Sequence, residues 1–372
     1  MDSILLTAAH KKELVVKDDI PSQSDGTMVI NTNRLTKAFG HLIAVNDLHL
    51  QVMRGDVFGF LGPNGSGKTT TIRMLLGLIR PTAGRAILFG MDNAYQLPAI
   101  LQRIGAIVEM PVFYSYLSGL DNLRVVAAAS GMMSGPSNNR RLEEVLDIVE
   151  LRAYEKLPFR KYSLGMKQRL GIAAALLTDP ELVLLDEPTN GLDPAGMIEI
   201  RHLITRLSSL GKTIFLSSHI LYEVQQVCNR VAILQKGNLI KQGTVAELLR
   251  DSEAIEVRMN REDESHYALH ILQQAQVRGM DWVKQIQLST NRRNQLILVI
   301  SAPSHRSAEV NAFLAHNKLF AAEIHPREGS LEELFLEVTT SASQEGRAGL
   351  QALANVANEA TEQAHNAKRE AL

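Results

Sequence analysis

The chain has 372 residues, a length that as a soft prior suggests two or three domains. Its 45% hydrophobic and 21% charged residues exclude global disorder, and 39 Lys and Arg against 40 Asp and Glu exclude a strongly basic coat for nucleic acid. The one cysteine, Cys228, excludes an internal disulfide or a zinc site of several thiolates and suits a reducing compartment.

The sequence also lacks the run of about 18 apolar residues that a membrane-spanning helix needs. Residues 1–27 form a polar leader in which Lys11, Lys12 and Glu13 interrupt short apolar runs. They do not follow the plan of a secretory signal. We therefore expect a soluble, cytosolic chain whose role at a membrane would come through a partner.

From about Met28 the pattern becomes globular. The segment MVINTNRLTKAFG is strand-like, and LHLQVMRGDVFGFLG leads into a glycine-rich loop. A helix is predicted over TTTIRMLLGLI, with Pro81 ending it after Arg80. Helical periodicity also covers residues 119–131 and 137–152.

Three short, almost wholly apolar runs follow as strands. They are ELVLLDEP at 181–188, TIFLSSH at 213–219 and VAILQKG at 231–237. Apolar strands that alternate with helices indicate a largely parallel α/β sheet buried on both faces.

A different pattern begins after about Arg250. Strands are predicted at 253–259, 282–289, 295–301 and 320–326, and helices at 262–276, 305–318 and 330–339. The order βαββαβ plus a helix is that of a ferredoxin-like domain. His266 and His270 have a spacing that can bind metal, but an ordinary helix surface is the favoured interpretation. Residues 341–372 are rich in Ala, Gln, Asn and Glu and predict a marginal helix or a disordered tail.

The sequence GPNGSGKTT fits the phosphate-binding pattern G-x-x-x-x-G-K-[ST] and lies between a strand and a helix. Its glycines let backbone N–H groups face phosphate oxygens, and the helix dipole adds positive potential. Lys68 would reach the β- and γ-phosphates and Thr69 would ligate Mg²⁺. An incidental glycine-rich turn is the alternative. The candidate nucleotide-binding residues are Gly62, Pro63, Asn64, Gly65, Ser66, Gly67, Lys68, Thr69 and Thr70.

Two carboxylates end the apolar run LVLLDEP. Asp186 is a candidate Mg²⁺ ligand through water. Glu187 would point to the opposite side of an extended chain and is a candidate general base for water. A solvated pair of acids at a strand end is the alternative.

Lys68 and Asp186 lie too far apart in the sequence for a minimal P-loop kinase or small GTPase. Between them, YSLGMKQRLGIAAALL resembles the signature segment of ABC-transporter ATPase subunits, a resemblance that covers about residues 28–250. It implies that Ser163 and Gly165 bind the γ-phosphate of ATP held by a partner subunit. A helix start with an ordinary serine cap is the alternative.

The same resemblance implies further roles. Asp193 in NGLD would position the opposite site, and His219 in LSSH would contact the γ-phosphate and hold water in register with Glu187. Phe39 in KAFG would stack on adenine, with core packing as the alternative. Glu109 stands where the family usually has glutamine; it could ligate Mg²⁺, but it loses an amide donor and adds charge. This substitution and YSLGMKQR resemble the antibiotic-exporter and lantibiotic-immunity branch.

The fold class expected is therefore α/β, a P-loop NTPase core of the ABC ATPase type at 28–250 with a helical subdomain at about 109–168. A C-terminal α+β domain at 251–340 would follow. The resemblance implies ATP and Mg²⁺ as cofactors, a homodimer in which a second copy completes each site, and a separately encoded transmembrane permease that holds the chain on the inner face of the cell membrane. The function implied is ATP hydrolysis that drives export, with no nucleic acid expected. A soluble ABC-type ATPase acting on ribosomes or nucleic acid is the open alternative.

Overall fold

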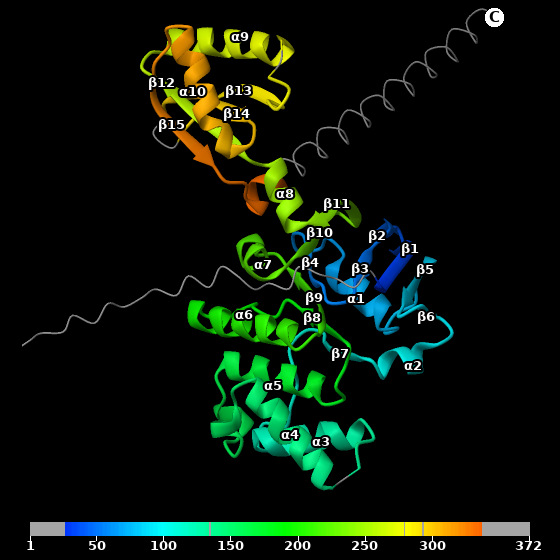
Figure 1. Cartoon of the computed structure of the whole chain (residues 1–372). Helices are drawn as coiled ribbons and strands as arrows, with labels where there is room; N and C mark the ends of the chain where they lie inside the picture. Colours follow the sequence, from blue (N-terminus) through cyan, green and yellow to red (C-terminus); the bar gives the residue numbers. More distant parts are fainter. Residues whose placement is uncertain (1–26, 134, 279, 292–293, 337–372) are drawn as a thin grey trace, which may run out of the picture.

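The computed structural model describes residues 27–133, 135–278, 280–291 and 294–336, so most of the predicted leader and the whole predicted tail lie outside the described residues. The described strands form three sheets (Figure 1). The strands are β1 (Met28–Phe39), β2 (Leu42–Leu48), β3 (Gln51–Met53), β4 (Val57–Leu61), β5 (Ala83–Leu88), β6 (Met91–Asp92), β7 (Ile104–Ile107), β8 (Leu182–Asp186), β9 (Thr213–Ser218), β10 (Arg230–Gln235), β11 (Asn238–Thr244), β12 (Ala254–Met259), β13 (Gln285–Thr290), β14 (Leu296–Ser301) and β15 (Ala321–Arg327). The α-helices are α1 (Lys68–Leu75), α2 (Leu97–Leu101), α3 (Gly119–Ala129), α4 (Pro136–Ile148), α5 (Leu164–Leu176), α6 (Pro194–Ser209), α7 (Leu221–Val227), α8 (Val245–Asp251), α9 (Glu262–Arg278) and α10 (Ser307–His316).

The central sheet has the order β11-β10-β4-β9-β8-β7. Every neighbouring pair from β10 to β7 is parallel, and only the edge strand β11 is antiparallel to its neighbour. The prediction of a largely parallel α/β sheet is therefore confirmed. The antiparallel strands β1, β2, β3, β5 and β6 form a separate sheet beside it.

Burial on both faces explains why the central strands are continuously apolar. In β4, Val57 and Leu61 belong to the core cluster that includes the helical residues of α3 to α7, whereas Phe58 and Phe60 belong to the cluster that includes α1 and β1. The rings of Phe58 and Phe215 stack with centroids 5.7 Å apart. Successive side chains of a strand point to opposite faces, so a sheet covered on both sides needs no polar alternation.

The strand order brings three loops to one edge of the sheet. β9 lies between β4 and β8, with Leu61 paired to Ser218 and Asp186 paired to Ser217. Because these strands are parallel, the loops after their carboxyl ends open at the same edge, where ligands bind in sheets of this type.

The first helix is shorter than predicted. α1 ends at Leu75, and Pro81 is not what ends it. Gly77 adopts φ +68°, its N–H donates to Met74 O at 3.0 Å, and the Leu78 N–H donates to Arg73 O at 2.9 Å. These paired bonds form a Schellman motif, so a left-handed glycine closes the helix before the proline is reached.

Helices α3, α4 and α5 pack against one another and form the lower end of the molecule in Figure 1. The helix predicted over 137–152 stops at Ile148, and a single 3₁₀ turn follows at Arg152–Tyr154. Arg169 and Arg206 donate to the last carbonyls of this segment, at Val149 and Ile148 respectively. Cationic side chains thus bind the carbonyls that a helix end leaves without partners.

The third sheet has the order β13-β14-β12-β15 and is antiparallel throughout. Its elements follow the predicted order βαββαβ, and residues of α9 and α10 are buried in one cluster with its strands. Residues 331–336 are helical, but Leu331 and Leu334 belong to the core cluster of the central sheet. The sequence pattern had grouped this last helix with the C-terminal domain at 251–340.

Within the described ranges, no helix combines the length and apolar character that crossing a bilayer requires.

Candidate nucleotide-binding and hydrolysis site

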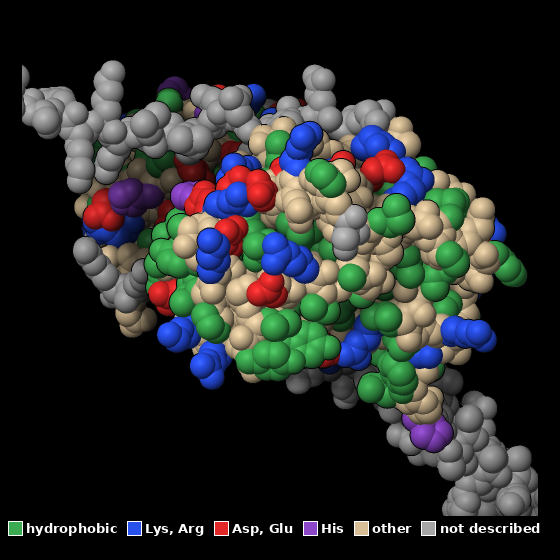
Figure 2. Space-filling view, turned by 90° about the horizontal axis from the view of Figure 1, so that it is seen from below, with side chains coloured by type: hydrophobic (Ala, Val, Ile, Leu, Met, Phe, Trp, Pro, Cys, Tyr) green, Lys and Arg blue, Asp and Glu red, His purple; other side chains and the backbone are tan. Residues whose placement is uncertain are grey.

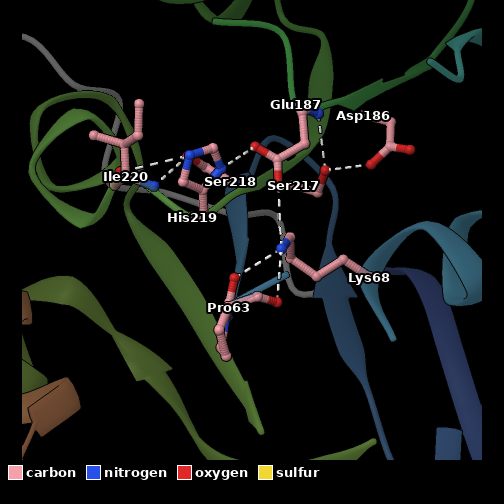
Figure 3. Close-up of polar contacts among 9 residues, drawn as sticks. Pro63, Lys68, Asp186, Glu187, Ser217, Ser218, His219 and Ile220 are labelled. Carbon is pink, nitrogen blue, oxygen red and sulfur yellow. Dashed lines mark hydrogen bonds and ion pairs between the residues drawn. The ribbon is translucent and has the colours of Figure 1, made fainter. Parts of the chain in front are cut away.

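Residues 62–67 join β4 to α1, and Lys68, Thr69 and Thr70 form the first turn of that helix, as the phosphate-loop pattern predicts. Lys68 is 5% exposed and turns back over this loop. Its Nζ donates to Gly62 O at 2.7 Å and to Pro63 O at 3.3 Å (Figure 3). The hydroxyl of Ser66 is buried and finds no hydrogen-bond partner in the described structure. A buried hydroxyl without a partner at the start of a helix marks a place for a polar ligand.

Two glycines of this loop cannot be replaced without moving the backbone. A Cβ on Gly62 would lie 2.5 Å from Leu234 O. Gly67 has φ +104°, and a Cβ there would lie 2.4 Å from Ala44 O. The tip of the loop is exposed and consists of Pro63, Asn64 and Gly65. Gly62 and Gly67 thus pack closely on neighbouring backbone, whereas the exposed tip of the loop is open to a ligand.

Ser217 joins the two consecutive carboxylates. Its hydroxyl donates to Asp186 Oδ1 at 2.5 Å and accepts from the backbone N–H of Glu187 at 2.9 Å. Asp186 is 5% exposed, so its carboxylate is held in the edge of the sheet. The pairing of β8 with β9 therefore fixes where the chain turns toward the phosphate loop.

Glu187 lies between a lysine and a histidine (Figure 3). Its Oε1 is 3.1 Å from Lys68 Nζ, and its Oε2 is 2.7 Å from His219 Nδ1. The residue has φ +49°, so the expectation of an extended chain at this position is wrong. A left-handed conformation is uncommon for a residue with a side chain, and here it directs the carboxylate at both partners.

The signature residues start a neighbouring helix. Ser163 caps α5 by accepting from the Met166 N–H at 3.1 Å, and Asp193 caps α6 by accepting from the Gly196 N–H at 3.0 Å. A Cβ on Gly165 would lie 3.9 Å from the Cα of Gly196, so the two helix starts adjoin. Among the described contacts, no hydrogen bond joins Ser163 or Gly165 to Lys68.

Two other predicted residues lie at the margin of the site. The Phe39 ring is 50% exposed at the end of β1, with Lys37 Nζ 5.0 Å from its centroid. Glu109 has φ +66°, and its carboxylate forms an ion pair with Arg73 of α1. Arg73 lies one helical turn after Thr69, so this pair ties the loop at Glu109 to the helix that begins at the phosphate loop.

The sequence interpretation missed Ser217 and Arg73. Ser217 was visible in LSSH, but its role depends on strand β9 lying beside β8. Arg73 carries a weak signal, a cation four residues after Thr69, that acquires meaning only with its partner Glu109. No group of three or more metal-ligating residues, His266 and His270 included, comes together in the part of the chain that the structure describes.

Comparison with known proteins identifies the family. The profile of the family described as ABC transporter matches residues 45–190. The bacitracin transport ATP-binding protein BcrA of Bacillus licheniformis is 45% identical over 250 residues, which are 65% of this chain and 80% of that protein. The chain belongs to the ABC transporter ATP-binding proteins. It is an ATP-binding subunit of a family that hydrolyses ATP.

The similarity to other ABC proteins extends beyond the nucleotide site. The uncharacterized ABC transporter ATP-binding protein YcbN of Bacillus subtilis is 33% identical over 315 residues, covering 84% of this chain and 97% of that protein. A solved bacterial ABC transporter cassette, determined as a dimer, is 25% identical with a TM-score of 0.53, covering 58% of this chain and 98% of that one. The ABC ATPase fold is thus shared with relatives of known structure.

Proposed function

We propose that this ABC protein is the ATPase of an exporter, that it acts as a homodimer, and that it drives a separately encoded membrane permease. The contact of Glu187 with both Lys68 and His219 carries the proposal. A carboxylate held by an imidazole beside a phosphate loop is suited to take a proton from an attacking water. His219 then orients Glu187, and Lys68 binds the β- and γ-phosphates.

The residues at the loop fit a Mg²⁺-triphosphate. The ammonium of Lys68, the hydroxyl of Ser66 and the N-terminus of α1 are donors for phosphate oxygens. The hydroxyl of Thr69 and the carboxylate of Asp186 are the oxygen ligands that Mg²⁺ prefers, and the ion would neutralise charge on the phosphates. The ion pair with Arg73 engages Oε1 of Glu109, so this carboxylate would approach the ion through its other oxygen.

The position of the two candidate half-sites on different helices supports a homodimer. Ser163 and Gly165 lie at the start of α5, whereas Lys68 lies at the start of α1. In a pair of chains, the signature segment of one copy would face the phosphate loop of the other. The dimeric cassette among the similar structures supports this arrangement.

A groove lined mainly by residues with hydrophobic side chains, with Gln102, Ser130 and Thr178 among its polar members, supports a membrane partner. It has a volume of about 590 Å³ and is lined in part by Leu101, Val108, Met110, Val112 and Phe113. Val112 is 93% exposed, whereas Phe113 packs edge-on against Phe159 at 5.2 Å. Hydrophobic side chains are also exposed on the lower face of the molecule (Figure 2). A helix of a permease is the occupant that we propose for this groove, and the transport named for BcrA supports it.

The test is co-purification from detergent-solubilised membranes with a candidate permease. We expect the wild-type chain to co-purify and to hydrolyse Mg-ATP, and Val112→Asp to lose the partner while still binding ATP, because a charge in an apolar contact is costly. Phe320→Asp, at another exposed apolar residue, is the matched control. Co-sedimentation of the wild-type chain with ribosomes instead of membranes would favour the alternative function.

Two serines with the same local role separate dimer closure from helix stability. Ser163 caps α5 and Ser118 caps α3, each accepting a backbone N–H three residues on at 3.1 Å. Either change to Ala removes an N-cap, at a cost of about 1 kcal/mol. We expect only Ser163→Ala to weaken ATP-dependent dimer formation, measured by light scattering. Equal dimerisation of the two variants would contradict the assignment of Ser163.

A further inference from the structure

The chain returns to the central core after the small sheet. Figure 1 shows the stretch after β15 coming back beside α8. Gly329 makes the contact, since a Cβ there would lie 1.9 Å from Leu249 O and 2.4 Å from Ser252 Oγ. Only a residue without a side chain allows the two segments to approach this closely.

The helical residues 331–336 then pack onto the core beside α7. Leu331 and Leu334 are 0% and 3% exposed and share a buried cluster with Val224 and Val227 of α7. The Leu331 N–H donates to Gln225 Oε1 at 3.1 Å. A helix leaves its first N–H groups without partners, so a side chain of α7 caps the returning helix. We call residues 329–336 the return segment.

Helix α7 begins directly after the histidine of the site. Ile220 is its N-cap, and the Ile220 N–H donates to Ser218 Oγ at 2.9 Å. His219 lies between these two residues and reaches Glu187 at 2.7 Å. His219 therefore lies in the short link between β9, which ends at Ser218, and α7, so a shift of α7 would move its backbone (Figure 3).

The other side of α7 packs tightly on β4. A Cβ on Gly59 would lie 2.5 Å from Val224 Cγ1 and 3.2 Å from Cys228 Sγ. Burial raises the pKa of the Cys228 thiol. Helix α7 is thus in contact with both β4 and the return segment and has little room to shift, because protein interiors are closely packed.

We infer that the return segment is a clamp on α7 that positions His219 against Glu187, so that the C-terminal part of this chain controls the hydrolysis step. The inference rests on the proposed roles of Glu187 and His219. Gln225 and Leu331 are positioning residues, since each acts on the site through α7. The sequence pattern assigns the return segment to the C-terminal domain, but in this proposal the segment acts on the hydrolysis site of the ATPase.

The test compares neighbouring glutamines on α7 in the full chain. Gln225→Leu removes the acceptor for Leu331, Gln225→Glu keeps it, and Gln226→Leu alters an exposed position on the same helix. We expect Gln225→Leu to lower kcat roughly tenfold, the size of effect that coupled packing residues have, with KM for ATP unchanged. Gln225→Glu should recover most of the rate, and Gln226→Leu should match the wild type. Leu331→Ala is a second, independent way to loosen the clamp.

Cys228 gives a readout that does not depend on activity. It is the one cysteine of the chain and is buried at the end of α7. We expect a maleimide to label it slowly in the wild type and several-fold faster in Gln225→Leu and Leu331→Ala, because opening of α7 exposes the thiol. Equal labelling rates in all variants would overturn the clamp.

A double-mutant cycle with His219→Ala tests whether the return segment changes kcat through His219. If the return segment acts through His219, Gln225→Leu lowers kcat no further once the imidazole is absent. An equal additional loss in that background would overturn the inference and leave the proposed function standing. A His219→Ala variant as active as the wild type would overturn the proposed role of His219 itself, and the inference with it.

Discussion

Replacing Glu187 with Gln is expected to abolish turnover while nucleotide remains bound. The amide keeps the size of the side chain but cannot take a proton, and general-base catalysis contributes roughly 10² to 10⁴ in rate. The change also removes the negative charge that lies 3.1 Å from Lys68 Nζ. The Lys68 ammonium then interacts with the phosphates without competition from this carboxylate. We therefore expect an ATP-bound dimer to accumulate. Phosphate release and size-exclusion chromatography with Mg-ATP would measure both effects.

Glu181→Gln is the matched control for Glu187→Gln. Glu181 immediately precedes β8, at the opposite end of the strand from the site, and forms ion pairs with Arg103 at 2.5 Å and Arg54 at 2.9 Å. The hydrogen bond from Arg103 lowers the pKa of the Glu181 carboxyl. Its contribution to stability is thus present at neutral pH and is lost as the pH falls through the lowered pKa. We expect Glu181→Gln to lower the melting temperature at pH 7 and to leave turnover intact. A slow Glu181→Gln variant, or a Glu187→Gln variant with normal turnover, would contradict the assignment.

Replacing Lys68 with Ala is expected to weaken ATP binding by roughly 10²-fold, the equivalent of losing charge-assisted hydrogen bonds to the phosphates. The loss has a second cause within the protein. Without the ammonium, Gly62 O loses a donor at 2.7 Å and Glu187 loses a cation in a site where its side chain is 20% exposed. An uncompensated carboxylate next to the loop would repel the triphosphate.

Titration with a fluorescent ATP analogue would measure this change in Kd. Lys156→Ala removes a lysine at an exposed position and is the control. Thermal melting would show whether Lys68→Ala remains folded. A folded Lys68→Ala variant that binds ATP as tightly as the wild type would disprove the proposed phosphate contact.

Local patterns predicted most of the fold. The apolar runs that became β8, β9 and β10 were visible because strands buried on both faces need no polar residues. The βαββαβ order after Arg250 was visible because its strands and helices differ in period. The end of α1 was predicted wrongly, since Pro81 is a strong signal and the left-handed conformation of Gly77 has no equally clear signature.

The site was predictable as a set of residues but not as a set of contacts. Lys68, Glu187 and His219 were identified separately, whereas their mutual contacts depend on β9 lying between β4 and β8. Strand order is a property of the whole sheet and has no local signal. The left-handed conformation of Glu187 also escaped prediction, because the hydrogen bond from its N–H to Ser217 Oγ depends on β9 lying beside β8.

The contact of Gly329 with Ser252 changes what the small sheet is topologically. Its two ends lie close together and Leu331 and Leu334 rejoin the central core, so we propose that residues 253–328 are an insertion within the ATPase. Truncation of the chain after Arg250 would remove the return segment together with the small sheet. The effects of the two losses on activity could then not be separated. A short linker from Ser252 to Gly329 would delete the sheet alone. Domain insertion is tolerated where the ends of the inserted domain lie close together, so this junction is a place where other modules could be inserted into the ATPase.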